Sequence, residues 1–364
     1  MKVYLNDIAH TALSNETILE FVRRVENHEA IPTMCQDDRL DNFGSCRVCS
    51  VEVAREPGGI KKTVASCHTP VFEGAYIYHQ TDIIKRLRKN ILELVLTDYP
   101  ADKVFPEQGK NPTEFQKTIA EIGIPNVRYP KGQTKIDFEK DNSHPYINSD
   151  LSQCINCYRC VRACEEIQGE MVLGMSGRGF ATHIIKGFDT SFDLSACVSC
   201  GACVQTCPTE ALTDKFKTKT LVPDETVRTT CTYCGVGCQL DVSVIDGEIK
   251  GIQAPKTAEV NQGHTCLKGR FAFQYYNHPD RLRTPLIKKN GQFEEVTWDE
   301  AYDFMTEGLL KVKNKYGADA IGCISSSRAC NEENYLMQKM TRVALNTNNI
   351  DGCARVCHAP TAYG

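Results

Sequence analysis

The chain has 364 residues, twenty cysteines and a formal net charge of −4. Because both signs of charge are interspersed, the sequence offers no basic surface for nucleic acid, and it has no apolar run long enough to span a bilayer. The cysteines fall into sets with metal-ligand spacing, which argues against a disulfide framework and predicts a reducing compartment. The amino-terminus lacks a basic stretch followed by an apolar one, so we expect a soluble cytoplasmic protein.

The first 80 residues combine a strand, a helix and a cysteine loop. Residues 1–6 alternate apolar and polar side chains, and residues 17–25 carry apolar side chains at helical spacing. Four cysteines follow: Cys35, Cys46, Cys49 and Cys67. A four-cysteine zinc site usually pairs two Cys-x-x-Cys hooks and only one is present, so four thiolates around two irons is the favoured interpretation. The spacing resembles the β-grasp [2Fe-2S] domain of complex I-type and hydrogenase-type electron-transfer subunits.

The next segment, 81–145, is predicted to be a helix and a connector. Apolar residues recur at three- and four-residue steps over 81–98, with basic residues such as Arg86 and Arg88 between them. We interpret this as an amphipathic helix whose basic face is solvated. Residues 100–145 show little periodicity and are rich in Pro, Gly, Lys and Asn, which indicates a surface connector.

Eight cysteines between residues 154 and 207 form two copies of one spacing. The copies are Cys154, Cys157, Cys160 and Cys164, then Cys197, Cys200, Cys203 and Cys207, with Pro208 directly after the last. In such runs the first three thiolates hold one [4Fe-4S] cluster and the fourth ligates the other cluster. We therefore expect Cys207 to complete the first set and Cys164 the second. Zinc knuckles or a disulfide staple are the alternatives, but zinc sites seldom use two interleaved runs that end in Cys-Pro.

A further cysteine set has a different spacing: Cys231, Cys234, Cys238 and Cys266. Between its last two members, alternating apolar residues flank Asp246-Gly247, which predicts a β-hairpin that returns Cys266 to the loop. The spacing is similar to the amino-terminal [4Fe-4S] domain of the molybdopterin oxidoreductases. In that family the lysine at the Lys268 position lies between the cluster and the pterin, where a cation favours electron transfer.

The last 84 residues, 281–364, are predicted to begin an α/β domain. Thr297 and Glu300 form a capping-box signature for a helix that Gly317 should end. A strand at 320–325 and a helix at 332–345 are expected to follow.

The stretch 348–360 resembles the active-site segment of molybdenum- or tungsten-dependent formate dehydrogenases. The resemblance implies that Cys357 ligates the metal and that His358 handles protons near the substrate. A thiolate suits such a metal, and an imidazole titrates near neutral pH. The chain is thus similar to the amino-terminal part of a formate dehydrogenase catalytic (alpha) subunit with complex I-type iron–sulfur modules.

This resemblance implies an α+β multi-domain protein. The expected parts are a β-grasp [2Fe-2S] domain (1–80), the helix and connector (81–145), a bacterial-type 2[4Fe-4S] ferredoxin-like domain (146–222), a [4Fe-4S] domain of molybdopterin oxidoreductase type (223–280) and the start of an α/β molybdopterin domain (281–364). Related proteins often bind another [4Fe-4S] cluster through a histidine and three cysteines after the 81–98 helix. Here Tyr99 occupies the histidine position, so we expect that cluster to be absent.

The implied cofactors are one [2Fe-2S] cluster, three [4Fe-4S] clusters and, where the family's carboxy-terminal domains are present, a molybdenum or tungsten bis(pterin guanine dinucleotide). We expect the 364-residue chain alone to be catalytically incomplete. Its expected role is electron relay in a formate dehydrogenase or CO2 reductase. The alternatives are a non-catalytic electron-transfer subunit and, less favoured, an iron-iron hydrogenase subunit. Implied partners, in a hetero-oligomer, are a flavin-containing subunit that oxidises NAD(P)H, ferredoxin or a hydrogenase subunit.

Overall fold

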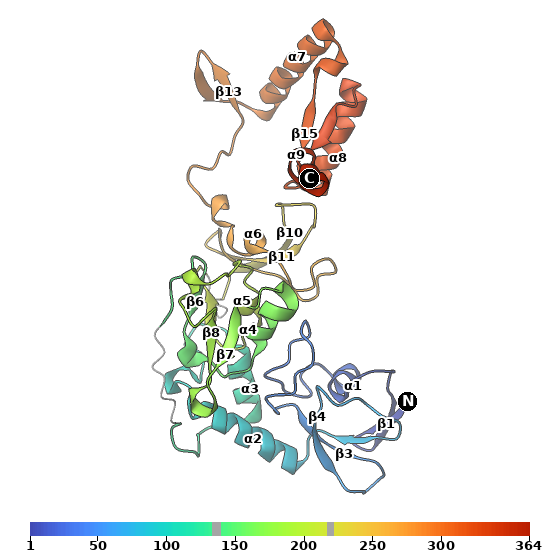
Figure 1. Ribbon diagram of the computed structural model, residues 1–364, viewed down its shortest axis with the longest axis vertical. Helices are drawn as coiled ribbons and strands as arrows, with labels where there is room; N and C mark the ends of the chain where they lie inside the picture. The colour runs from blue at the N-terminus through green and yellow to red at the C-terminus, as the bar shows by residue number, and fades with distance from the viewer. Residues whose placement is uncertain (133–139, 217–221) are drawn as a thin grey trace. The chain divides into compact units, whose positions relative to one another are not determined.

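A computed structural model describes residues 1–132, 140–216 and 222–364, which form two compact units, Met1–Pro223 and Asp224–Gly364 (Figure 1). Both units combine short helices with small sheets, which confirms the α+β multi-domain prediction. None of the helices in the described ranges is long and apolar enough to cross a membrane.

The first unit begins with a five-stranded mixed sheet around one helix. In the order β2-β1-β5-β3-β4, β1 and β5 are parallel and the other neighbours are antiparallel. The strands are β1 (Lys2–Leu5), β2 (Ile8–Thr11), β3 (Ser50–Ala54), β4 (Lys62–Ala65) and β5 (Tyr76–Tyr78). Helix α1 (Ile18–Val25) buries Phe21 and Val22 in the core, and Thr17 and Glu20 close its capping box. The predicted strand and helix are both confirmed.

Helix α2 (Asp82–Leu96) confirms the predicted helix but not its polar face. Arg88 is 4 % exposed, whereas Ile83 and Leu94 of the expected apolar stripe are exposed. The prediction that the whole basic face is solvated is therefore wrong at Arg88, because backbone carbonyls outside the helix accept its hydrogen bonds.

The connector contains a helix that the sequence analysis missed. After η1 (Ala101–Lys103), helix α3 (Glu114–Ile122) buries Phe115 and Ile119 against α2. A capping box between Thr113 and Gln116 starts this helix, and that signal is present in the sequence. The connector is therefore part of the core and not only a surface segment.

The ferredoxin-like part of the first unit consists of short elements between long cysteine loops. Strand β6 (Ile147–Ser149) pairs with β9 (Leu212–Asp214), and β7 (Leu173–Ser176) pairs with β8 (His183–Lys186), both antiparallel. The helical segments are η2 (Leu151–Gln153), α4 (Arg159–Arg162), η3 (Ala163–Gln168), η4 (Gly179–Ala181), η5 (Phe192–Leu194) and α5 (Ala202–Thr206).

The second unit opens with a three-stranded antiparallel sheet of β10 (Glu225–Thr230), β11 (Gln239–Ile245) and β12 (Glu248–Gln253). The predicted hairpin is confirmed, since Asp246 and Gly247 turn between β11 and β12 with φ of 52° and 75°. Helix α6 (Leu267–Phe271) and η6 (Gln274–Tyr276) follow, and then the hairpin of β13 (Leu286–Lys289) and β14 (Gln292–Glu295).

The remainder of the second unit is a strand-helix-strand arrangement. Helix α7 (Trp298–Tyr316) starts with the predicted capping box of Thr297 and Glu300 and ends at Gly317. After η7 (Ala318–Ala320), the parallel strands β15 (Cys323–Ser325) and β16 (Ile350–Gly352) are connected through α8 (Asn331–Lys339) and η8 (Met340–Leu345). Helix α9 (Ala354–Tyr363) follows. This alternation confirms the predicted start of an α/β domain.

Candidate metal centres

The two ferredoxin-like cysteine runs have the same backbone conformation. In each run, the residues two and four positions after the first cysteine adopt positive φ. They are Asn156 and Tyr158 in the first run, and Ser199 and Gly201 in the second. The N–H of Asn156 points at Cys154 Sγ and that of Ser199 at Cys197 Sγ, each at 3.4 Å. Both loops therefore turn backbone donors toward their first sulfur, as a thiolate ligand requires.

The fourth cysteine of each run affects the pKa of thiols in the opposite run. Burial raises the pKa of the Cys154 thiol to about 12, and repulsion from Cys157 and Cys207 adds to the rise. Burial also raises the pKa of Cys157 to about 12, again with a contribution from Cys207. In the second set, Cys164 contributes in the same way to the raised pKa of Cys197. Cys207 also contributes to the raised pKa of Cys203 in its own run, so the interleaved ligand assignment stays a prediction.

The first cysteine loop brings its four thiols together as two pairs. Cys49 Sγ lies 3.4 Å from Cys67 Sγ, and Cys35 forms a hydrogen bond with Cys46. That bond lowers the pKa of Cys35 to about 5, against burial, with help from the backbone N–H groups of Ser45 and Cys46. These donors at Cys35 favour a thiolate there.

Arg88 donates hydrogen bonds to the backbone of the same loop. The sequence analysis did not predict this role. The Arg88 Nε donates to Val48 O at 3.1 Å and its Nη2 to Ser50 O at 3.0 Å. Burial lowers the pKa of this guanidinium to about 10, and it stays charged at neutral pH. The sequence gives no local signal for this role, because the carbonyls that accept its hydrogen bonds lie 38 and 40 residues earlier in the chain.

The last cysteine set lies in the second unit. Burial raises the pKa of Cys231 and of Cys238, and repulsion from Cys234 and Cys266 adds to both shifts. The N–H of Cys231 donates to Cys238 O at 2.7 Å, which closes the loop. Cys266 precedes α6, and a Cβ on Gly269 would meet Thr265 Oγ1 at 2.2 Å and Cys231 Sγ at 3.7 Å. The absence of a side chain at Gly269 therefore leaves room for the Thr265 hydroxyl beside α6.

All four sets consist of thiols, which is the donor chemistry of iron–sulfur clusters. Tetrahedral zinc, with Zn–S of about 2.3 Å, draws its sulfurs to within about 3.8 Å of one another. Across the residues that the structure describes, no three His, Cys, Asp or Glu side chains are grouped tightly enough to hold a single metal ion. The choice between iron–sulfur clusters and zinc therefore rests on the thiol-only donor sets and their spacing.

The predicted catalytic residues are exposed. Cys357 and His358 lie next to each other on α9, and Thr361 Oγ1 donates to Cys357 O at 3.1 Å. Lys268 is exposed on α6, and its Nζ lies 5.9 Å from the centroid of the Tyr233 ring. The structure records no contact within the described residues between Lys268 and either Cys357 or His358, so their joint role stays a prediction.

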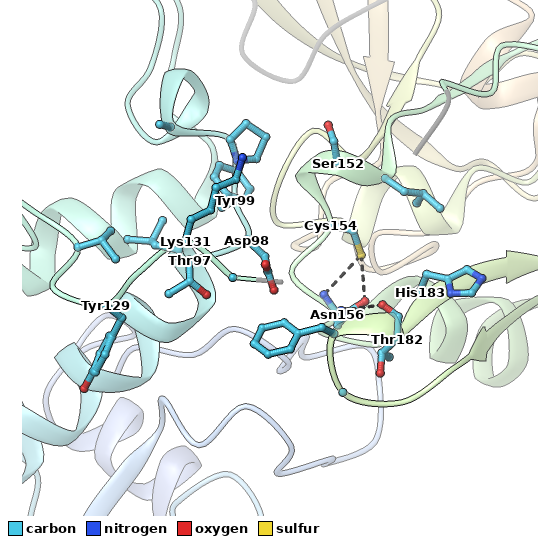
Figure 2. A pocket seen from close by; sticks show the side chains of 18 of the residues that line it. Thr97, Asp98, Tyr99, Tyr129, Lys131, Ser152, Cys154, Asn156, Thr182 and His183 are labelled. Carbon is cyan, nitrogen blue, oxygen red and sulfur yellow. Dashed lines mark hydrogen bonds between the residues drawn. The ribbon is translucent and has the colours of Figure 1, made fainter. Parts of the chain in front are cut away.

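A pocket of about 630 Å³ lies beside Cys154 in the first unit. Figure 2 shows Cys154 with Asn156, whose Nδ2 donates to Thr182 O at 3.3 Å. Tyr99, at the position where related proteins have a histidine, also lines this pocket, and its ring packs 5.0 Å from that of Phe115. Burial raises the pKa of Tyr99 above its ordinary value, so the side chain is a neutral phenol at physiological pH. Cys154 is thus a candidate ligand that borders a cavity.

Four family models match the chain in succession. They describe a 2Fe-2S iron-sulfur cluster binding domain (residues 1–82), the ferredoxin-like domain of NADH-quinone oxidoreductase subunit 3 (144–213), the molybdopterin oxidoreductase Fe4S4 domain (224–278) and molybdopterin oxidoreductase (281–364). The chain belongs to the molybdopterin oxidoreductases. Each of the four cysteine sets falls inside one of the three iron–sulfur models of this molybdopterin oxidoreductase.

Among curated relatives, the chain is 31 % identical over 390 residues to "Putative formate dehydrogenase SAB2186c" of Staphylococcus aureus strain bovine RF122 / ET3-1. A protein of S. aureus strain MRSA252 with the corresponding description is 30 % identical. The match covers 95 % of this molybdopterin oxidoreductase chain and 38 % of each relative. The chain therefore spans less than half the length of the curated relatives it matches.

Among solved structures, a chain of an NAD+-reducing [NiFe]-hydrogenase in the H2-reduced state is similar with a TM-score of 0.53 and 24 % identity. The similarity covers 61 % of this chain and 90 % of the hydrogenase chain. At this identity, the likeness establishes a shared fold for the matched part of the molybdopterin oxidoreductase.

Proposed function

We propose that this molybdopterin oxidoreductase relays electrons in a formate dehydrogenase or CO2 reductase, which converts formate to CO2, one proton and two electrons. The main support for the proposal is that one chain contains four sets of four cysteines together with the adjacent residues Cys357 and His358. The relatives described as formate dehydrogenases support the choice of substrate.

Each thiol set is proposed to hold one cluster that accepts or donates one electron. A [2Fe-2S] cluster is assigned to Cys35, Cys46, Cys49 and Cys67, and [4Fe-4S] clusters to Cys154, Cys157, Cys160 and Cys207, to Cys164, Cys197, Cys200 and Cys203, and to Cys231, Cys234, Cys238 and Cys266. The shared backbone turns of the paired runs and the thiol-only donor sets support these assignments.

At the other end of the relay, Cys357 is proposed to ligate molybdenum or tungsten held by pterin dithiolenes, and His358 to accept the formate proton. Lys268 would assist electron transfer between that site and the cluster of Cys231. The electron partner is proposed to be a flavin subunit that oxidises NAD(P)H, ferredoxin or a hydrogenase subunit in a cytoplasmic hetero-oligomer. The hydrogenase fold likeness supports a multi-subunit setting.

The test is anaerobic purification of the protein in a form that includes the family's carboxy-terminal domains, from cells supplied with molybdate or tungstate. We expect bound molybdenum or tungsten and bleaching of the iron–sulfur absorbance by formate. The variant Cys357→Ser should keep its iron and lose the formate-driven bleaching, and Cys323→Ser, a cysteine outside all four sets, is the matched control. A protein that holds iron, binds neither metal and responds only to dithionite would support a non-catalytic electron-transfer subunit instead.

A further inference from the structure

Two buried arginines on α4 join the ferredoxin-like part of the first unit to the first cysteine loop. Arg159 and Arg162 are 2 % and 6 % exposed. A guanidinium is buried at low cost only where its fixed donors find acceptors. Here, three of the acceptors are backbone carbonyls 121 to 127 residues earlier in the chain. The contacts therefore connect two parts of the unit that are far apart in sequence.

Arg162 contacts the first cysteine itself. Its Nη1 donates to Cys35 O at 3.1 Å, and its Nη2 donates to Asp41 O. Glu166 accepts from Arg162 Nε at 3.0 Å and from the Asp41 N–H at 2.8 Å. One guanidinium and one carboxylate thus hold the segment from Cys35 to Asp41 at both ends.

Arg159 makes the equivalent contact one residue farther along. It donates to Gln36 O and to Thr206 O, the latter at 3.3 Å, and forms a two-pronged pair with Glu114 at 2.8 and 2.7 Å. The Thr206 hydroxyl in turn donates to Asp37 Oδ2 at 2.8 Å. The contacting residues of the ferredoxin-like part are therefore Arg159, directly before Cys160, and Thr206, directly before Cys207.

Apolar contacts join the same two parts of the unit. Leu40 packs with Ala163 and Ala202 in a small buried cluster, and the Arg162 guanidinium lies 4.9 Å from the centre of the Phe43 ring. Both arginines face carboxylates, Glu114 and Glu166, so their charges are largely balanced. Their effect is then mainly geometric, through the direction of the hydrogen bonds.

We infer that Arg159 and Arg162 form a latch that sets the separation between the Cys35 cysteine set and the Cys154 cysteine set. This inference rests on the proposed function, because it presumes a cluster at each set. The two arginines are positioning residues. The rate of electron transfer between two clusters falls steeply with their separation. The latch holds the loop that carries Cys35 in direct contact with the loop that carries Cys157 and Cys160. Without it, the loop that carries Cys35 would keep the Asp41–Glu166 hydrogen bond and the apolar and threonine contacts, but its backbone would lose three hydrogen bonds from the two guanidiniums.

Magnetic relaxation in the whole protein tests the latch. In dithionite-reduced protein, a paramagnetic [4Fe-4S] cluster nearby speeds relaxation of the [2Fe-2S] signal, and this dipolar effect falls with the sixth power of the separation. We expect the microwave power at half-saturation to fall at least tenfold in the double variant Arg159→Met/Arg162→Met, with iron content unchanged. The control variant Arg128→Met removes the ion pair between Arg128 and buried Glu93 in the same unit. It should leave the half-saturation power unchanged.

Lysine variants give a second, milder measurement. Arg159→Lys and Arg162→Lys each keep the charge but lose the forked donors, so we expect intermediate half-saturation powers. If the double variant fails to assemble its clusters, the two lysine variants test the inference instead. Half-saturation powers equal to that of the wild type would then overturn the latch. Wild-type relaxation in an iron-replete double variant overturns it as well. A wild-type protein without a [2Fe-2S] signal would instead contradict the proposed function.

Discussion

Arg88 donates from Nε to the carbonyl of Val48 at 3.1 Å, so a residue of α2 holds the turn between Cys46 and Cys49. A second donor, Nη2, reaches Ser50 O, and the side chain is 4 % exposed. The helix that follows the β-grasp sheet is therefore tied directly to the proposed [2Fe-2S] loop.

Replacement of Arg88 by leucine should destabilise this region. The change leaves the Val48 and Ser50 carbonyls without their donors, which costs about 1–3 kcal/mol for each buried group. We expect a lower thermal midpoint and weaker retention of the [2Fe-2S] cluster, measured by calorimetry and visible absorbance. Arg86→Leu, at an exposed position of the same helix, should change stability by less than about 0.5 kcal/mol. Equal effects of the two variants would contradict the support role of Arg88.

The proposed clusters predict about fourteen irons per chain, from one [2Fe-2S] and three [4Fe-4S] centres. Tyr99 is buried against Phe115 at the position where related proteins bind a further cluster, and a neutral phenol is a poor iron ligand. Iron and sulfide analysis of anaerobically purified protein measures the count. About eighteen irons, with a histidine-ligated signal, would show that the Tyr99 region binds a cluster after all.

The proposed [2Fe-2S] centre should have a low reduction potential. Four thiolates place plant-type centres near about −400 mV, whereas two histidine ligands raise the potential to between about −150 and +300 mV. A redox titration followed by electron paramagnetic resonance measures this value. A potential well above zero would contradict the assignment of Cys35, Cys46, Cys49 and Cys67.

Lys268 should affect the rate of reduction and not the assembly of the cluster. Its side chain is exposed and lies over Tyr233, so Lys268→Ala removes a cation without opening the core. In protein that carries the molybdenum or tungsten site, we expect slower reduction by formate and unchanged iron content. Lys250→Ala, at a lysine on β12 of the same unit, is the control. A parallel loss of iron in Lys268→Ala would mean that the residue is structural.

The local features of this protein could be predicted from the order of its residues. Cysteine spacing predicted the thiol sets, because most ligands of each proposed cluster lie on one short loop with fixed offsets. The capping box at Thr297 and the Asp246-Gly247 turn predicted α7 and the β11-β12 hairpin for the same reason, since their causes lie within a few residues.

Which polar side chains are buried depends instead on contacts between distant segments of the chain. Arg88, Arg159 and Arg162 are unremarkable basic residues in the sequence, and each is buried because carbonyls distant in the chain accept its hydrogen bonds. Helix α3 likewise joins the core through Phe115, whose N–H donates to Pro208 O at 3.0 Å. Such contacts depend on how separate segments pack, and no local spacing encodes that packing.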